Sequence, residues 1–590
     1  MDLEALRHGN FASLGEAIGD WSKVVKNLTT LKNDARDDLK GKADKADWAG
    51  LNATVSREFI TKTAGEFADA VTQATTIRDI LRDTRDELVA YRGELTRALD
   101  KGWEKRLTAV GTQGGGFKVF VNVHPEPANS KQAVDALRDE LQGILTKATT
   151  SDTTAAQVLR AISKQAEHGF SDASYKDRDS AADALRHADD MARIAKKDPN
   201  DMSSEELKTF NQTLHKYQSD SLFAEQFAKK LGARETLQFW SEMADVHAGA
   251  KGGELNELKE LQKNLSMTLA TATHSDSIGM QEWKQKITEE GNTNFRPDPS
   301  NPSKGAVGVL GVQVMSSLMS QGKYDTEFLD DYGKKLLKGD IAPPGQTGMG
   351  TNDVWKGPGQ TLDLVFGKGD GRDPMIGFMD ALSHNSEAST NTFDSKPVLD
   401  HVLESTKYTD RGQSVGHALE AAVSGVSHGE TPSGPQPHSR TQVEIMKNVM
   451  HAVAQPDGGT ALVSKEIGES FGHMASGYMP EINRTIAGYG AESIFLTDSA
   501  APDGLDRTDT TRFLYEVAKD PDGRAALLYG ESIYTGSSIE AHIADDSLYD
   551  GNTNDAIRTV AKNSGVIEGI IGHSNADTEV GDAIGNEKEQ

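Results

Sequence analysis

Apolar side chains recur at alternating spacings of three and four residues along two long stretches near the N-terminus. The first stretch carries Phe11, Leu14, Ile18, Trp21, Val25 and Leu28, and the second carries Phe67, Ala70, Ala74, Ile77, Leu81, Thr84, Leu88, Tyr91 and Leu95. This spacing places one apolar stripe on each of two helices, in the register of a coiled coil. Residues 1–104 are therefore predicted to form a long helical hairpin. A continuous helix over residues 51–99 would be about 70 Å long, so it is expected to project or to pair with something.

The two stripes define a hairpin seam that we name by eight residues: Leu14, Ile18, Trp21, Phe67, Ile77, Leu81, Leu88 and Tyr91. Between the stripes, Asp47-Trp48-Ala49-Gly50 marks the bend. The Trp48 ring would close the open end of the hairpin, and Gly50 would allow a backbone conformation that other residues adopt only at a cost. A plain helical bundle, with Trp48 as a core residue at a turn, is the alternative interpretation of the same pattern.

Two antiparallel helices joined by Trp-x-Gly resemble the WXG-motif superfamily, small helical hairpins exported by the type VII secretion system of Gram-positive bacteria. The resemblance covers about the first 100 residues and depends on Trp48, Gly50 and the flanking heptads. It implies that Trp48 and Gly50 form an export and pairing motif and that the type VII secretion machinery is a partner. It also implies pairing through the hairpin seam, with a helical partner protein or with a second copy.

The family's secretion tag, Tyr-x-x-x-Asp/Glu just after the second helix, is not at its usual place in this chain. Tyr91 is followed four residues later by Leu95. The nearest match is Tyr175 with Asp179, in a polar stretch far downstream, and this pair is the candidate secretion tag.

Hydrophobic positions alternate with period two after the helical hairpin. Leu107 and Ala109 precede a glycine-rich turn over residues 111–116, and Phe117, Val119, Val121 and Val123 follow it. This pattern predicts a β-hairpin over residues 105–128, which needs a neighbouring helix or sheet to be stable. The glycines lack the following Lys-Ser/Thr of a phosphate-binding loop, so they are interpreted as a turn.

Helical periodicity returns from about residue 130 to the end. Apolar residues at 134–145 and 158–162 predict two helical segments, the second with Asp152 as N-cap, and Ser203 and Glu206 form a capping box. A weak helix-turn-helix repeat is also visible, in which Phe223, Phe227 and Leu231 match Phe328, Tyr332 and Leu336, with looser copies at 378–393 and 513–528. This part resembles the long C-terminal extensions of large proteins that begin with a WXG hairpin. The resemblance implies a helical architecture for this part, but these extensions have no assigned activity that could be inferred for it.

Proline- and glycine-rich segments divide the helical part of the chain. Three prolines between residues 297 and 302 mark a boundary between helical domains at 129–292 and 305–590, whereas 343–359 and 429–437 are expected to be long loops. The expected fold is mainly α, with the long helical hairpin, one short β-hairpin and a multi-helix body. After Ile584, Gly585 is the only residue that could act as a helix stop signal. The sequence therefore leaves open whether the native chain continues beyond Gln590.

The content of charged residues limits the classes of partner that this chain is expected to bind. The 590 residues include 63 basic and 90 acidic side chains, giving a net charge of −27. Nucleic acid and anionic membranes need a basic face, so neither is expected as a partner. The acidity is uneven, since residues 501–590 carry 7 basic and 18 acidic groups whereas residues 1–100 carry 15 and 18.

Several signals bear on the location of the protein. It has no cysteine, which agrees with an extracellular destination. Met1-Asp2-Leu3-Glu4 has neither a basic nor an apolar signal-peptide region, so leaderless export of a protein made in the cytoplasm is expected. The most apolar run, residues 306–315, is too short for a membrane span.

Candidate chemistry is sparse. Gly425-Val426-Ser427-His428-Gly429 fits Gly-x-Ser-x-Gly, but helical pattern precedes it and a loop follows it, the reverse of a nucleophile elbow. His384, His417, His428, His438, His451 and His473 gather within 90 residues without a metal-binding spacing such as His-Glu-x-x-His. No catalytic residue, cofactor or metal is therefore expected.

The sequence thus predicts a secreted or cell-surface, non-enzymatic protein whose helical body serves as scaffold, carrier or effector. Two alternatives stay open. One is a cytoplasmic helical structural or interaction protein, and the other is a serine hydrolase that uses Ser427.

Overall fold

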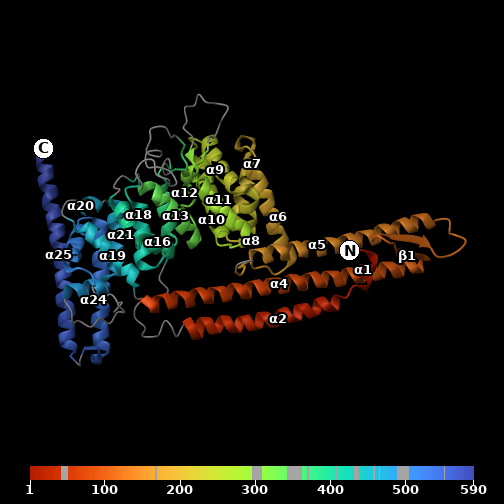
Figure 1. The fold of residues 1–590 in the computed structure, drawn as a ribbon, viewed down its shortest axis with the longest axis horizontal. Helices are drawn as coiled ribbons and strands as arrows, with labels where there is room; N and C mark the ends of the chain where they lie inside the picture. Colours follow the sequence, from red (N-terminus) through yellow and green to blue (C-terminus); the bar gives the residue numbers. More distant parts are fainter. Residues whose placement is uncertain are drawn as a thin grey trace.

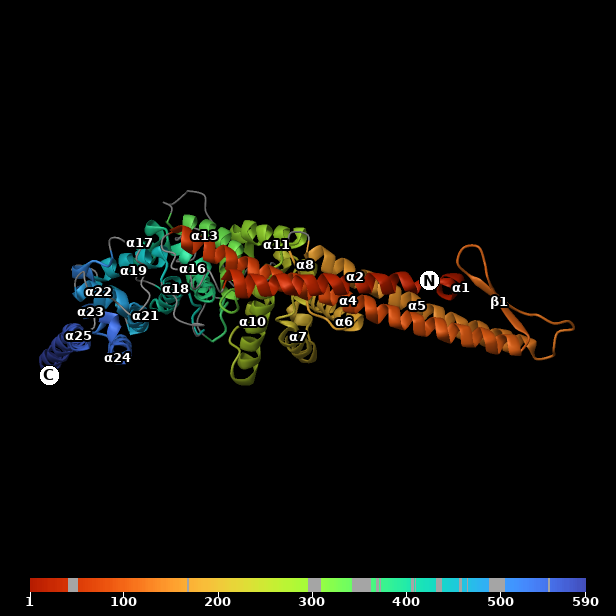
Figure 2. The ribbon, with the colours of Figure 1, turned by 90° about the horizontal axis from the view of Figure 1, so that it is seen from below.

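A computed structural model describes most of the chain. The described residues are 1–40, 51–166, 169–295, 309–341, 362–367, 371, 373–404, 408, 410–430, 438–455, 459–463, 465–487, 504–549 and 552–589. The molecule is elongated (Figure 1): a long helical arm with a β-hairpin forms one end, and the C-terminal helices form the other. Figure 2 shows the same order of elements from below.

The arm is built from α1 (Leu3–His8), α2 (Phe11–Asn33), the π-helical turn η1 (Asp34–Lys40), α4 (Leu51–Glu104), β1 (Leu107–Gly111), β2 (Phe117–Val121) and α5 (Ser130–Gln165). Helices α2 and α4 lie side by side, as the heptad spacing predicts. With 54 residues, α4 is about 80 Å long, and it packs against α2, α5 and α6 along its length. The predicted long helix is confirmed, and it finds its neighbours within this chain.

The β-hairpin is confirmed. Strands β1 and β2 are antiparallel, with Leu107 opposite Val121 and Gly111 opposite Phe117, and the turn between them contains Gly114 and Gly115 with positive φ. Leu107 and Ala109 are buried in a hydrophobic cluster with α1, α4 and α5. Packing on these helices supplies the support that an isolated two-stranded hairpin lacks.

One expected helix boundary is wrong. Asp152 does not begin a second helix, because it lies inside the 36-residue helix α5. The polar residues around it are accommodated by bonds back to the preceding turn: Thr149 donates to the Leu145 carbonyl at 2.7 Å and Thr153 to the Thr149 carbonyl at 2.8 Å. Continuous packing of α5 against α4 outweighs the low helix propensity of Thr, Ser and Asp.

The first half of the body comprises α6 (Arg178–Ala195), η2 (Pro199–Asp201), α7 (Ser204–Tyr217), α8 (Ser221–Leu231), α9 (Ala233–Val246), α10 (Gly252–Thr273), α11 (Ile278–Glu289) and η3 (Glu290–Asn292). The capping box of Ser203 and Glu206 opens α7, as the sequence predicts. Two-residue strands β3 (Asn294–Phe295) and β4 (Val309–Leu310) then form an antiparallel pair that the sequence analysis did not anticipate.

The second half comprises α12 (Gly311–Leu318), α13 (Thr326–Ile341), α15 (Pro374–Ser383), α16 (Ser386–Phe393), α17 (Lys396–Glu404), α18 (Gln413–Ser424), α19 (Arg440–Val453), α20 (Gly459–Leu462), α21 (Lys465–Gly477), α22 (Met479–Ala487), α23 (Arg507–Val517), α24 (Pro521–Ala544), η5 (Asp546–Tyr549) and α25 (Thr553–Glu589). None of the helices in the described part of the chain is both long and apolar enough to cross a membrane.

The repeated helices α8 and α13 are built alike. Asp220 caps α8 by accepting a hydrogen bond from the Phe223 amide, and Asp325 accepts one from the Phe328 amide at 3.0 Å. The two sets of matching apolar residues are all buried: Phe223, Phe227 and Leu231 on α8, and Phe328, Tyr332 and Leu336 on α13. The repeat therefore reflects two helices that bury the same face in one core.

That core is continuous through the body. One hydrophobic cluster extends from Ala184 to Ile571, and it contains Ile287 before the predicted domain boundary and Val312 after it. The expected division into 129–292 and 305–590 is thus not accompanied by a break in the core. The elements on the two sides of the proline-rich segment pack together, α12 against α9 and α10, and β3 against β4.

Candidate functional site

The hairpin seam is incompletely buried. Ile18 and Leu88 are buried, whereas Leu14, Trp21, Phe67, Ile77, Leu81 and Tyr91 are half-buried. Helix α2 also exposes Val24 by 40% and Leu31 by 46%. Packing against α4 therefore covers only part of the apolar surface of α2 and leaves the rest open to solvent.

Two seam residues belong to hydrophobic clusters that include elements other than α2. Ile77 packs against the cluster of α4, α5, α6 and α8 that contains Ile80 and Val158. Leu88 belongs to the cluster with α1, β1 and α5 that contains Leu107 and Leu141. Because α4 is covered on a second side by α5, its apolar positions serve two interfaces, and a heptad pattern alone cannot separate them.

Trp48 and Gly50 lie outside the described residues. They belong to residues 41–50, which connect the end of η1 to the start of α4. The two flanking helices are described, and they run side by side (Figure 1).

The candidate tag residues Tyr175 and Asp179 lie at the joint between the arm and the body. The Tyr175 hydroxyl donates to the carboxylate of Asp220 at 2.6 Å, and its amide donates to Thr76 Oγ1 of α4 at 3.2 Å. Burial raises the pKa of Tyr175 strongly, and the neighbouring Asp220 charge adds to the shift. Asp179 is exposed and pairs with Arg178. Tyr175 therefore has a structural contact that ties α4 to the start of α8.

Arg178 also lies at the joint between the arm and the body, and the sequence did not identify it as a residue that connects the two. It is 4% exposed, it forms an ion pair with Glu87 of α4 at 2.8 Å, and it also donates to Ser151 of α5. It joins three helices of the arm and body. Its only sequence signal is an arginine at the first position of an amphipathic helix, which is too common a feature to single it out.

A group of acidic side chains lies on α4 close to the linker that follows α5. Burial, followed by the charges of Asp172 and Glu66, raises the pKa of Asp69 to about 6. The folded state therefore binds a proton at Asp69 more tightly than the unfolded chain, and stability is lost as pH rises from about 4 to about 6.

Asp69→Asn is expected to stabilise the protein above pH 6, by no more than about 1 kcal/mol because Asp69 is partly solvated, and to have no effect near pH 3. Urea unfolding at pH 3.5, 5 and 7.5 measures this difference. Asp86→Asn, an exposed substitution on the same helix, is the matched control. An equal gain for Asp69→Asn at all three pH values would contradict the proposed charge effect.

Ser427 lies in a helix-to-loop setting, in agreement with the pattern around it. Helix α18 ends at Ser424, and Gly425 caps it in the left-handed region with φ of 69°. The Ser427 side chain is buried, and its hydroxyl donates to the His384 carbonyl oxygen at 3.0 Å. The hydroxyl thus holds the loop after α18 against the end of α15.

Glu420 is the centre of the histidine-rich region. His428 Nδ1 and His473 Nδ1 lie 3.6 and 3.5 Å from its carboxylate oxygens, and the rings of His417 and His428 stack with centroids 3.7 Å apart. Burial opposes ionisation of Glu420, but hydrogen bonds from His473 and Ser470 outweigh it and hold its pKa below the usual value. The same hydrogen bond raises the pKa of His473.

These groups form an ion-paired surface cluster. In the described part of the chain, no set of three or more His, Cys, Asp or Glu side chains is arranged to hold a metal ion. Two other histidines of the region each pair with one carboxylate: His438 Nδ1 lies 2.9 Å from Glu481, and His451 Nδ1 lies 2.8 Å from Asp509.

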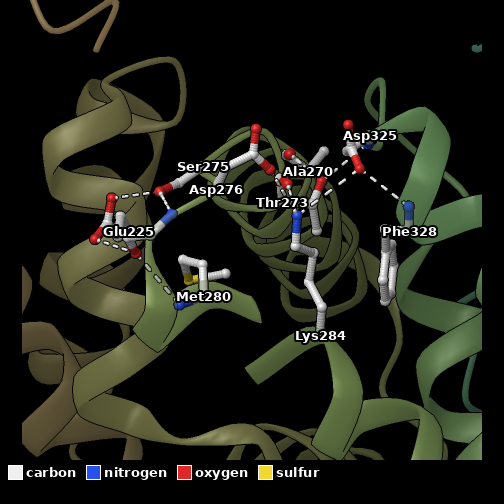
Figure 3. Close-up of polar contacts among 10 residues, drawn as sticks. Glu225, Ala270, Thr273, Ser275, Asp276, Met280, Lys284, Asp325 and Phe328 are labelled. Atoms are coloured by element: carbon white, nitrogen blue, oxygen red, sulfur yellow. Dashed lines mark hydrogen bonds and ion pairs between the residues drawn. The ribbon is translucent and has the colours of Figure 1, made fainter. Parts of the chain in front are cut away.

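Figure 3 shows a polar junction at the end of α10, where α8, α10, α11 and α13 meet. Glu225 of α8 is 2% exposed, and its carboxylate accepts hydrogen bonds from Ser275 at 2.7 Å, from Ser277 at 2.9 Å and from Lys229. Ser277 in turn caps α11 by accepting from the Met280 amide. The buried charge of Glu225 is therefore compensated by donors from two elements.

Lys284 lies on the other side of the same turn (Figure 3). Its ammonium donates to the Thr273 carbonyl at 3.0 Å and lies 3.5 Å from Asp276 and 3.8 Å from Asp325. Asp325 caps α13, and its amide donates to Thr273 Oγ1. Because each of these charges has a partner or caps a helix, we interpret the junction as a structural connection between the two repeated helices.

A cavity of about 480 Å³ lies in the arm, between the β1–β2 turn and α5. Its lining includes Gly115, Arg138, Gln142, Thr149 and Thr153, and the amino group of Met1 donates to Thr149 Oγ1 at 2.7 Å. The lining mixes hydroxyl, amide and guanidinium groups with the apolar side chains of Phe117 and Leu145, whereas pockets for small molecules are mainly apolar with a few placed polar groups. The cavity is therefore the weakest of the candidate sites.

Comparison of this chain with protein-family models, with curated proteins and with solved structures found no match.

Proposed function

We propose that this chain is a secreted, non-enzymatic protein exported by a type VII secretion system. In this proposal the hairpin of α2 and α4 is the export and pairing module, and the helical body is a scaffold, carrier or effector that acts outside the cell or on its surface. The observation that carries the proposal is the sequence position of Trp48 and Gly50, between the residues of two helices that lie side by side and carry the heptad spacing.

The incomplete burial of α2 supports the pairing role. Val24 and Leu31, seven residues apart, lie on one stripe of α2 and are exposed. A partner helix, from another protein or from a second copy, would cover this stripe in the way that a third helix completes a bundle. The type VII machinery would then recognise the hairpin or the paired hairpins.

Substitution of the motif tests the proposal. Trp48→Ala is expected to reduce the amount of protein in the culture medium to background while the amount in the cell pellet is maintained. Trp103→Ala is the matched control, because Trp103 is a tryptophan of α4 outside the motif and is 68% exposed. Export of Trp48→Ala at the level of Trp103→Ala would favour the plain helical bundle.

A further inference from the structure

Helix α24 exposes four large apolar side chains and buries three polar ones. Its solvent face carries Leu528, Tyr529, Ile533 and Ile543, which are exposed by 40%, 69%, 54% and 66%. The side toward α22 and α25 contains Glu531, Ser538 and His542, each at most 5% exposed. So large a set of exposed apolar residues on one helix marks an interaction site.

Glu531, a buried carboxylate on this side, is held by specific contacts, which fix the rotation of the helix about its own axis. Glu531 accepts a hydrogen bond from Asn483 of α22 at 3.0 Å and another from Thr535 at 2.9 Å. Leu527 and Gly530 on the same side are also buried. The exposed apolar residues therefore point to solvent, while the opposite side of the helix packs against α21, α22 and α25.

Except for Leu528, whose counterpart is Ala544, the exposed face of α24 is symmetric about Gly536. Counting outward from this glycine, Ile533 corresponds to Ile539, and Tyr529 corresponds to Ile543. Ser532 corresponds in the same way to Glu540, the only exposed charged residue between residues 525 and 544. At 100° per residue, all of these paired positions fall within about 60° of Gly536 on the helix surface.

We propose that α24 is a self-association surface, on which the α24 helices of two copies of this chain pack antiparallel about a twofold axis at Gly536. In this arrangement Tyr529 lies against Ile543 of the second copy and Ile533 against Ile539. A twofold interface requires a surface that is complementary to itself, which is what the symmetric order provides. The stripe from Tyr529 to Ile543 is about 21 Å long, enough for a helix crossing.

The charges of α24 favour a second copy over other occupants. The chain carries a net charge of −27, so two copies repel each other over most of their surfaces, but this stripe carries only Glu540. The twofold register places that carboxylate opposite the hydroxyl of Ser532, which can donate to it, and not opposite its own copy. Gly536 has no atom within 4 Å of the position that a Cβ would take, so the helices can approach closely at the axis.

The position of α24 agrees with this role. Helices α24 and α25 form the end of the elongated molecule opposite the β1–β2 hairpin (Figures 1 and 2). A second copy joined there leaves the arm, and with it the hairpin of α2 and α4, free for other partners. The proposed interface is therefore distinct from any pairing through the hairpin seam.

Single cysteines test the register directly, because the chain has no native cysteine. Mild oxidation of the full-length Gly536→Cys chain is expected to yield mostly disulfide-linked dimer on a non-reducing gel. Ser532→Cys alone is expected to stay monomeric, since its two copies would be offset by eight residues, roughly 12 Å along the axis. That offset exceeds the Cα separation of about 7 Å that a disulfide can bridge.

A mixture of Ser532→Cys and Glu540→Cys chains is expected to form the cross-linked dimer. Gly253→Cys, at an exposed helical glycine of α10 with equally open space, is the control for random collision. Equal cross-linking of Gly536→Cys and Gly253→Cys would overturn the proposal. Efficient self-cross-linking of Ser532→Cys would overturn the antiparallel register.

Sedimentation velocity over a concentration series tests the association without cysteines. Ile533→Asp is expected to raise the dimer Kd at least about tenfold, because a carboxylate would be buried against Ile539 of the second copy. Ile278→Asp on α11 is the matched control, since Ile278 is exposed by 52% and Ile533 by 54%. A wild-type chain that stays monomeric and instead floats with lipid vesicles would assign the face to a lipid surface and overturn the proposal.

Discussion

Replacing Trp240 with alanine is expected to lower the free energy of unfolding by about 3–5 kcal/mol, the range for removal of a large aromatic side chain from a core. Trp240 of α9 is fully buried and lies in the main hydrophobic cluster. Its indole N–H donates to the Leu364 carbonyl at 3.1 Å, and its ring meets Phe366 edge-on with centroids 5.5 Å apart. The substitution therefore removes packing and one hydrogen bond at the same place.

The carbonyl of Leu364 also accepts from Gln262 at 3.1 Å, so this oxygen keeps one partner in the variant. The cost should thus arise mainly from the lost ring volume. Guanidinium unfolding followed by circular dichroism at 222 nm measures it, and Trp103→Ala, at an exposed tryptophan, is the control with an expected change within about 0.5 kcal/mol. A Trp240→Ala variant as stable as Trp103→Ala would contradict the placement of segment 362–367 over α9.

Glu225→Ala is expected to destabilise the protein by about 2–4 kcal/mol, because hydrogen bonds to a charged acceptor are lost and buried hydroxyl groups are left without their partner. The carboxylate of Glu225 joins α8 to the turn between α10 and α11 through Ser275 and Ser277 (Figure 3). Lys229, on the same helix, would lose its ion-pair partner as well.

The same unfolding assay tests this prediction, with Glu282→Ala on the exposed side of α11 as the control. An effect of Glu225→Ala no larger than that of Glu282→Ala would mean that the polar junction adds nothing to stability. An apolar replacement of similar volume, Glu225→Leu, should recover part of the loss, since it removes the buried charge without leaving a cavity.

Periodicity was sufficient to predict α2, α4 and the β-hairpin of the arm, but not the unbroken length of α5. The three-and-four spacing from Phe11 to Leu28 and from Phe67 to Leu95 predicts α2 and α4, and the alternation around residues 111–116 predicts the β-hairpin. In both cases a local pattern coincides with the face that is buried. The same pattern could not show that α4 has a second neighbour in α5, because one helix with two buried sides gives overlapping stripes.

The polar contacts between residues far apart in the chain could not be predicted from the sequence. Glu225 and Arg178 are charged residues that a sequence places by default on the surface, and each is buried by contacts with elements far away in the chain. Lys284 is largely buried, and its ammonium lies 3.8 Å from the distant Asp325. The caps of the repeated helices are different, because Asp220 and Asp325 each precede a phenylalanine by three residues, a local signal that can be recognised.

The residues proposed for export also differ in how far the sequence alone could identify them. Trp48 and Gly50 are singled out by sequence alone and lie outside the described residues, whereas the flanking helices are described. The candidate tag residue Tyr175 is held by Asp220 and Thr76, contacts that link residues 45 and 99 positions apart in the chain. No local pattern predicts such a contact.

The most direct test of the central proposal is an immunoblot of culture medium and cell pellet, in a host with its type VII secretion ATPase intact and in one with the ATPase deleted. The proposal predicts that the full-length protein appears in the medium only when the ATPase is present. Equal amounts in the medium of both hosts, or retention in the pellet of both, would contradict export by this route.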